Sequence, residues 1–319
     1  MSKYKAIDLS KVKTYTIEKR ENKVNKNDFA GVYKKGSSFK NFIKTLPDIL
    51  AGKNFKEIVE AIVSAKKKKK PVLISMGAHV IKCGLSPIII DLIKNKIISG
   101  IALNGAGGVH DAEIALFGIT SEEVFEGMKT GRFGMVKETG VFLNQSAKEA
   151  SLRNMGLGER MGEKLLEEKA PYNDISILAN AYKASVPVTI HLAIGGDINH
   201  MHPNCRGEHL GKSTFHDFKI FANLIKDLGG GGVLINFGSA VVLPVIIEKS
   251  VTIARNLGYD VSDFTGVNFD FIRHYRSDMN LVQRVRYLGG KGYFVAGHHE
   301  LMIPLLFAAV KESMGTENR

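Results

Sequence analysis

Short apolar runs alternate with amphipathic segments along the chain from Pro71 onward. Runs such as PVLISM from Pro71 and GIALN from Gly100 are rich in branched residues, which is typical of strands buried on both faces of a sheet. The segments between such runs, for example LSPIIIDLIKNK from Leu85, carry apolar residues at helical spacing. This alternation predicts an α/β fold, a mostly parallel sheet covered by helices on both faces.

The same two patterns predict the remaining elements. We expect further strands at residues 186–194, 231–238, 264–271 and 292–297. We expect helices at residues 85–96, 109–118, 215–228, 240–256 and 298–313, and a helical block at 121–184. Residues 56–319 are therefore predicted to form a single domain. Residues 1–55 are polar, basic and weakly periodic, and we expect a basic N-terminal arm with a short helix at 39–50.

Composition narrows the classes of partner. The chain has 319 residues and a net charge of +12. Its lysines are spread widely and are dense in two places, from Lys3 to Lys44 and from Lys66 to Lys70. The second run suits the negative end of a helix dipole, which disfavours nucleic-acid binding. Positive charge equally suits an anionic small molecule. No segment resembles a membrane span or a signal peptide. Two cysteines, Cys83 and Cys205, fit a reducing compartment, so we expect a cytoplasmic protein.

Glycines and polar residues follow nearly every predicted strand. Ligands of open parallel sheets bind outside the carboxyl ends of the strands, so these turns carry the functional information. In NGAGG, the small residues Gly105, Ala106, Gly107 and Gly108 would let a ligand lie against the backbone, with the next helix presenting free N–H groups to a phosphate. The bland alternative is a tight turn between strand and helix.

A second small-residue turn, NFGSA, contains Gly238 and Ser239. Gly238 would allow close approach of a ligand, and Ser239 would cap the following helix. Two such turns in one sheet suit the two ends of a dinucleotide. Asp111, in the helix after the first turn, would hold a ribose hydroxyl or only complement the helix dipole.

Two clusters combine histidines with carboxylates. The stretch AIGGDINHMHPNC contains Asp197, His200 and His202, and GHHEL contains His298 and Glu300. Their spacing matches no strong metal motif, so we expect pocket-lining acid–base groups and no metal, with polar loop or helix-terminal roles as the bland alternative. The metal interpretation gains weight only if the two clusters meet in space.

In order, these turns resemble those of the deoxyhypusine synthase family from about Val72 to the C-terminal helix. ALNGAGGVHDAEI is similar to the family's strand, glycine turn and acid-bearing helix, and GAHVIKCGL to its preceding nucleotide-contacting turn. GGVLINFGSAVVLPVII and HHELMIPLLFAAV are similar to its triple-glycine turn and its terminal turn and helix. The resemblance implies a Rossmann-like fold, NAD as cofactor, a homotetramer, and transfer of an aminobutyl group from spermidine.

The resemblance also implies individual site residues. Carried over position by position, it places cofactor contacts at His79, Gly105, Ala106, Gly107, Asp111, Gly238, Asn268 and His298. It places Asp197, His200 and His202 in a loop that faces the reacting end of the ligand, where imidazoles stand in place of acidic groups that would hold a polyamine. An anionic substrate would suit that change.

The chain departs from the family at its catalytic lysine. It contains no tryptophan, the matching region near Gln283 to Arg286 has no lysine, and Lys291 would substitute only with a shift. Leu243-Pro244-Val245 stands where the family has a lysine and two histidines. Since an imine intermediate needs a deprotonatable lysine, we expect an NAD-dependent transferase of unknown substrate and not a deoxyhypusine synthase. The alternatives are a metal-dependent enzyme that uses the same histidines and a non-catalytic nucleotide-binding module.

Overall fold

The computed structural model describes residues 2–314, and its backbone divides into two compact units at Lys53 and Asn54. The N-terminal unit contains two short 3-10 turns, η1 (Ile17–Lys19) and η2 (Lys26–Asp28), and helix α1 (Phe39–Thr45). None of these three elements buries a residue. Helix α1 is shorter than expected because Leu46 precedes Pro47 and adopts an extended backbone.

The second unit is built on one sheet of six strands, all parallel. Its strands are β1 (Val72–Met76), β2 (Gly100–Asn104), β3 (Val188–His191), β4 (Val233–Phe237), β5 (Thr265–Asp270) and β6 (Lys291–Ala296). Their spatial order is β3-β2-β1-β4-β5-β6. This is the strand order of the Rossmann fold, so the predicted fold class is confirmed. The order reverses between β1 and β4, which we call the switch point.

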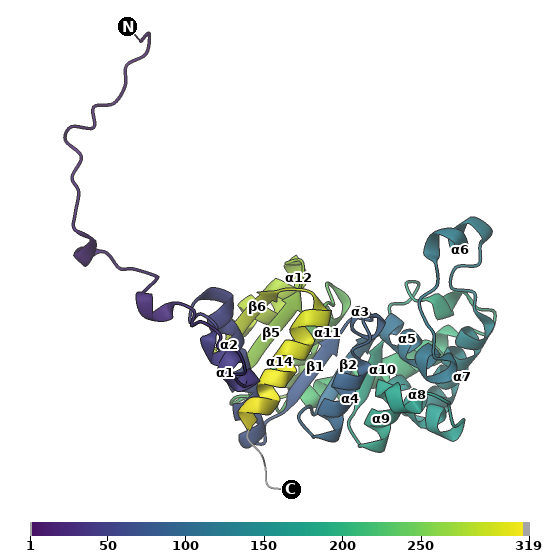
Figure 1. The fold of residues 1–319 in the computed structure, drawn as a ribbon. Coiled ribbons are helices and arrows are strands. Elements are labelled where there is room, and N and C mark those ends of the chain that lie inside the picture. Colours follow the sequence, from purple (N-terminus) through teal and green to yellow (C-terminus); the bar gives the residue numbers. More distant parts are fainter. Residues whose placement is uncertain (1, 315–319) are drawn as a thin grey trace. The chain divides into compact units, whose positions relative to one another are not determined.

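Helices cover both faces of this sheet. The helical elements from Leu50 onward are α2 (Leu50–Lys67), α3 (His79–Lys82), α4 (Ser86–Lys94), α5 (Gly105–Phe117), α6 (Val124–Thr130), α7 (Lys137–Arg153), α8 (Leu157–Glu167), η3 (Asn173–Ile175), α9 (Ile177–Lys183), η4 (Ile198–Met201), α10 (Gly207–Ile225), α11 (Val242–Asn256), α12 (Tyr275–Ser277), the π-helix η5 (Asp278–Gln283), α13 (Arg284–Tyr287) and α14 (His299–Met314). Figure 1 shows α4 and α14 crossing one face of the sheet. None of the helices within residues 2–314 is both long and apolar enough to cross a bilayer.

A single apolar cluster anchors α10 and α11 to the other face. Phe221 and Ile225 of α10 and Ile247 of α11 pack with Leu73 of β1 and Leu234 of β4. All five side chains are at least 99% buried. Because a fully buried leucine or phenylalanine stabilises the fold by about 1.5–3 kcal/mol, this cluster fixes where the carboxyl ends of β1 and β4 lie.

Helix α10 begins at Gly207, ahead of the expected start at Phe215. The apolar pattern missed its first part because some of the side chains that face inward are polar. Ser213 and Asp217 are fully buried, whereas Phe215 is 57% exposed. Oδ2 of Asp217 accepts hydrogen bonds from the backbone N–H of Gly158 (3.0 Å) and of Ile190 (2.9 Å), which ties α10 to α8 and β3. Burial raises the pKa of the Asp217 carboxyl to about 8.

The free energy of unfolding should therefore decrease as pH rises, because Asp217 loses its proton. Between the ordinary pKa of 3.8 and about 8, this carboxyl binds more protons in the folded than in the unfolded chain. Its contribution is complete below the lower value and is lost as pH rises through the upper one. We expect Asp217→Asn, which has no proton to lose, to flatten the decline. Urea unfolding at several pH values measures this, with exposed Asp227→Asn as the control. Equal slopes for Asp217→Asn and the parent would contradict the assignment.

Candidate functional site

The turns after β1 and β4 lie in direct contact at the switch point. The backbone N–H of Gly77 donates to the carbonyl of Phe237 (2.9 Å), and that of Gly238 donates to the carbonyl of Phe269 (3.1 Å). Gly238 has a left-handed φ of +67°, and a Cβ atom there would overlap the imidazole of His299. Position 238 thus requires glycine for both its backbone conformation and the space that His299 occupies.

A row of buried polar side chains inside the sheet holds these turns by hydrogen bonds. Ser75 on β1, Asn236 on β4 and Asn268 on β5 stand side by side in the register of the sheet. Ser75 Oγ donates to Asn236 Oδ1 (2.7 Å), and Asn236 Nδ2 donates to Asn268 Oδ1 (2.7 Å) and to the carbonyl of Ser239 (2.9 Å). Asn268, predicted to contact the cofactor, is fully buried in this row and holds the turns in place.

Two buried side chains at the switch point have polar atoms without a hydrogen-bond partner among the described residues. His299 is 1% exposed, and within residues 2–314 neither of its ring nitrogens has a hydrogen-bond partner. Asp270 is 2% exposed, with Oδ1 accepting from the N–H of Phe271 (2.8 Å) and Oδ2 left unpaired among the same residues. Burial lowers the pKa of His299, partly offset by the Asp270 charge. Unpaired buried polar atoms cost about 1–3 kcal/mol each, so these residues oppose the stability of the fold.

Helices α3 and α14 bring further side chains to the same place. The rings of His79 and His299 lie 6.0 Å apart, and His298 stacks on Phe271 with 5.8 Å between ring centroids. Cys83 Sγ donates to Glu300 Oε2 at 3.7 Å. Of the predicted site residues, the structure therefore gathers here His79, Gly238, Ser239, His298 and Glu300.

Sequence reasoning missed three residues of this group. Cys83, Asp270 and His299 were not among the predicted site residues. One local signal was present for Cys83: it follows His79 by four positions, which on a helix places both side chains on one face. Asp270 and His299 both lie in polar segments at the ends of predicted strands, but their unpaired atoms appear only once the fold has formed.

The NGAGG segment has a different local structure from the one expected. It forms the first turn of α5, which begins at Gly105 directly after β2, with Asn104 Oδ1 accepting from the N–H of Gly107 (2.9 Å). The Asp197 carboxylate lies against Gly105, where an added Cβ atom would overlap it. The chain's own acid thus covers the start of this helix. Burial raises the pKa of Asp197.

Asp111 is the anchor of another helix. It is fully buried and accepts hydrogen bonds from Ser176 Oγ (2.6 Å) and from the N–H groups of Ile177 (2.7 Å) and Leu178 (3.0 Å) at the start of α9. These contacts occupy both carboxylate oxygens. Asp111 therefore stabilises the packing of α5 on α9. It lies beyond the first turn of α5, which begins at Gly105 and contains no acidic residue.

A cavity of about 230 Å³ lies beside the covered start of α5. Its lining includes Lys82, Ala106, His110, Glu113, Glu122 and Asp197. His110 Nδ1 lies 2.6 Å from Thr120 Oγ1, and Thr120 in turn donates to Glu113 Oε2 (2.5 Å). Lys82 on α3 links this cavity to the switch point, because His79 at the other end of α3 lies beside His299.

The two histidines of the AIGGDINHMHPNC stretch have separate surroundings. His200 Nδ1 lies 2.8 Å from the carbonyl of Asp197, and its buried Nε2 has no partner within residues 2–314. His202 Nε2 lies 2.8 Å from the carbonyl of Gly134, and its ring packs where a Cβ of Gly140 would be. Among the described residues, the group placed to bind a metal contains neither histidine.

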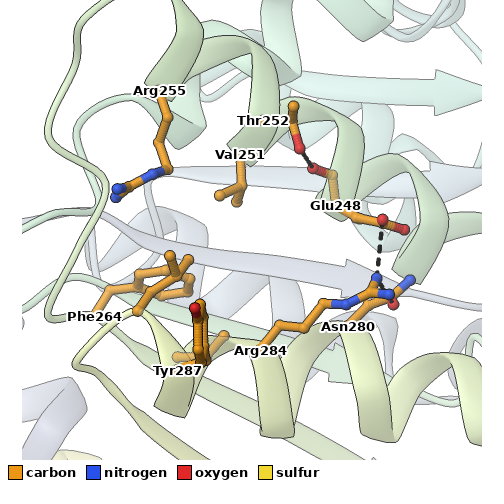
Figure 2. A pocket seen from close by; sticks show the side chains of 10 residues that line it. Glu248, Val251, Thr252, Arg255, Phe264, Asn280, Arg284 and Tyr287 are labelled. Atoms are coloured by element: carbon orange, nitrogen blue, oxygen red, sulfur yellow. Dashed lines mark hydrogen bonds and ion pairs between the residues drawn. The ribbon is translucent and has the colours of Figure 1, made fainter.

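The cavity in Figure 2 lies at the amino ends of the strands, away from the switch point. It has a volume of about 390 Å³ and is lined by α11, η5 and α13 residues together with Phe264, which precedes β5. Figure 2 shows Arg284 reaching Glu248, and this ion pair measures 2.9 Å. Lys291 also lies at this end, since it is the first residue of β6 and pairs with Thr265. Neither the cavity nor Lys291 belongs to the switch point.

Comparison with known proteins finds similarity in fold only. No family model and no curated protein matches the sequence. A proposed deoxyhypusine synthase from Entamoeba histolytica matches with a TM-score of 0.50 and 12% identity, over 88% of this chain and 95% of that one. The complex of AgrE with ornithine and NAD+ matches with a TM-score of 0.51 and 12% identity, over 82% of this chain. The match spans only 33% of AgrE. The predicted resemblance to deoxyhypusine synthase is confirmed at the level of the fold.

Gly238→Ala should destabilise the protein through His299. A left-handed φ costs a residue with a Cβ about 1–2 kcal/mol, and the overlap with His299 adds about 1–3 kcal/mol. Gly211→Ala is the matched control, because nothing lies within 4 Å of a Cβ at this position in α10, and it should stabilise by about 0.5–1 kcal/mol. Urea unfolding of both variants tests this.

A second substitution separates the two causes. Adding His299→Ala to Gly238→Ala removes the overlapping ring, so the double variant should be more stable than the two single effects added together. Strict additivity would show that His299 does not pack against position 238.

Proposed function

We propose that this protein is an enzyme that binds NAD at the switch point between β1 and β4. The observation that carries this proposal is the combination of a glycine turn that no other residue fits with the unpaired polar atoms of His299 and Asp270 beside it. Ligands of Rossmann-type sheets bind at this place. When bound, the cofactor would supply hydride acceptance or donation.

Individual residues would serve this binding in different ways. Gly77 and Gly238 would hold the turns after β1 and β4 together beside the ligand, because each packs against the chain itself. Asp270 Oδ2 and the His299 ring would form hydrogen bonds to polar groups of the ligand. His298, stacked on Phe271 and largely exposed, would act at the outer side of the site.

The cavity beside α5 is the proposed place for the substrate. Its lining combines three carboxylates, those of Glu113, Glu122 and Asp197, with the single ammonium of Lys82. This balance favours a small molecule that carries an amino group over the anion suggested by the net charge. Asp197, which lines this cavity, would contact it as an acid–base group. AgrE, which matches this chain in fold at 12% identity, forms a complex with ornithine.

Transfer of an aminobutyl group is not the reaction that we propose. Lys291, the nearest replacement for the family's catalytic lysine, begins β6 at the end of the sheet remote from the switch point. A transferase with another substrate remains our prediction for the reaction class. Cytoplasmic location and assembly into a tetramer also remain predictions.

NAD binding tests the proposal directly. In calorimetric titrations, we expect the parent to bind NAD and Asp270→Asn to bind it about 10- to 100-fold more weakly, since a hydrogen bond to a charged group contributes about 1.5–3 kcal/mol. Asp270→Asn keeps an oxygen for the N–H of Phe271. Arg255→Ala, in the cavity of Figure 2, is the control and should bind like the parent. A parent that binds no dinucleotide would refute the proposal, and binding without any hydride transfer would favour the non-catalytic module.

Assembly is tested through the exposed side chains of α6. Phe125 is 79% exposed and Met128 is 67% exposed, which makes this helix a candidate contact between copies. We expect light scattering to give a tetramer for the parent and a smaller species for the variant carrying Phe125→Glu and Met128→Glu. Tyr287→Glu, at a 92% exposed position remote in the sequence, should leave the mass unchanged. A monomeric parent at micromolar concentration would contradict the prediction.

A further inference from the structure

We propose that His79, Cys83 and Glu300 form a binding site for one divalent transition-metal ion of the zinc type. This site goes beyond the proposed binding of NAD and does not depend on it. We refer to the three residues as the His–Cys–Glu cluster. They lie on α3 and α14, next to the switch point.

The geometry of the cluster is close to that of a zinc site. One donor atom from each residue, an imidazole nitrogen, the thiol sulfur and a carboxylate oxygen, lies within 4.8 Å of the other two. Tetrahedral zinc with bonds of 2.0–2.3 Å holds its ligand atoms about 3.3–3.8 Å apart. Small rotations of exposed side chains supply this contraction, because His79 and Glu300 are exposed and free to adjust.

The backbone that carries the ligands is fixed. The N–H of Cys83 donates to the carbonyl of His79 (2.9 Å), which sets the spacing of these two ligands within one helical turn. Helix α3 begins two residues after the anchored Gly77, and Glu300 is the second residue of α14. The ligands therefore come from elements that the sheet positions.

The donor set selects the class of metal. Sulfur and imidazole donors favour zinc, cobalt and similar ions over magnesium and calcium, which prefer oxygen donors. Without metal, the Cys83 thiol donates a hydrogen bond to the Glu300 carboxylate. On metal binding that proton passes to the solvent, and both the thiolate and the carboxylate become ligands.

Two further histidines lie next to the cluster. The ring of His299 is 99% buried, unpaired within residues 2–314, and 6.0 Å from the ring of His79. His298 Nδ1 lies 3.8 Å from Glu300 Oε1, where it would orient the carboxylate as an outer-shell partner. Three protein ligands leave a fourth position for water or for an oxygen of a substrate, which is the arrangement of catalytic zinc sites.

Cobalt titration tests the site without any assay of activity. Co²⁺ bound to a thiolate gives a sulfur-to-metal charge-transfer band in the near ultraviolet, and we expect this band at one equivalent of metal. The chain offers a matched control, because it has only two cysteines. Cys83→Ser should abolish the band, and Cys205→Ser should keep it. Zinc should displace the cobalt and bleach the band.

The two other ligands are tested by affinity. His79→Ala and Glu300→Gln should each weaken zinc binding more than about 100-fold, the upper end of what outer-shell partners contribute. Circular dichroism of the metal-free variants checks that each is folded. A parent without the band, a band that survives Cys83→Ser, or one lost in folded Cys205→Ser would overturn the proposal. Because no dinucleotide is present, failure here leaves the NAD proposal standing, and failure of NAD binding leaves this site standing.

Discussion

The hydrogen-bonded row of Ser75, Asn236 and Asn268 is the constraint on which the rest of the site depends. It crosses three neighbouring strands inside the sheet, where an unpaired amide would cost about 1–3 kcal/mol. Each member therefore holds the register of the next strand. The row also bonds to the segments that follow the strands. Asn236 donates to the carbonyl of Ser239, and Asn268 donates to Ser277 Oγ (3.2 Å). The turns after β4 and β5 are thus fixed from within the sheet.

The same edge of the sheet shows two contrasting ways of treating polar groups. Beside β2 and β3, the carboxylate of Asp197 covers the start of α5 and also accepts the N–H of Ala193 (2.7 Å). Beside β1 and β4, Asp270 and His299 keep unpaired atoms while buried. At the start of α5 the chain's own carboxylate takes the position that a ligand would occupy, whereas His299 and Asp270 leave polar atoms unpaired within residues 2–314. This difference is why we place the cofactor at the switch point and not at the glycines of NGAGG.

The elements of the core domain were predictable because their apolar residues repeat locally. The strand of PVLISM and the helix after Pro87 need only their own sequence to be recognised. Helix α10 shows where this fails, since Ser213 and Asp217 face inward and bond to the sheet, so the apolar periodicity appears only from Phe215. The role of Asp111 was not predictable for a related reason, because its partners at the start of α9 lie 65 and more residues away in the sequence.

The candidate site was less predictable because its residues come together only when α14 packs across the sheet. Cys83 and Glu300 are 217 residues apart and come from opposite sides of the strand order. Only the return of α14 from the edge strand β6 brings its first turn beside α3. The family resemblance supplied His79, Gly238 and His298, since it carries three-dimensional information that periodicity lacks. It supplied no reason for a thiol at position 83, and the pairing of that thiol with Glu300 follows from this chain's own structure.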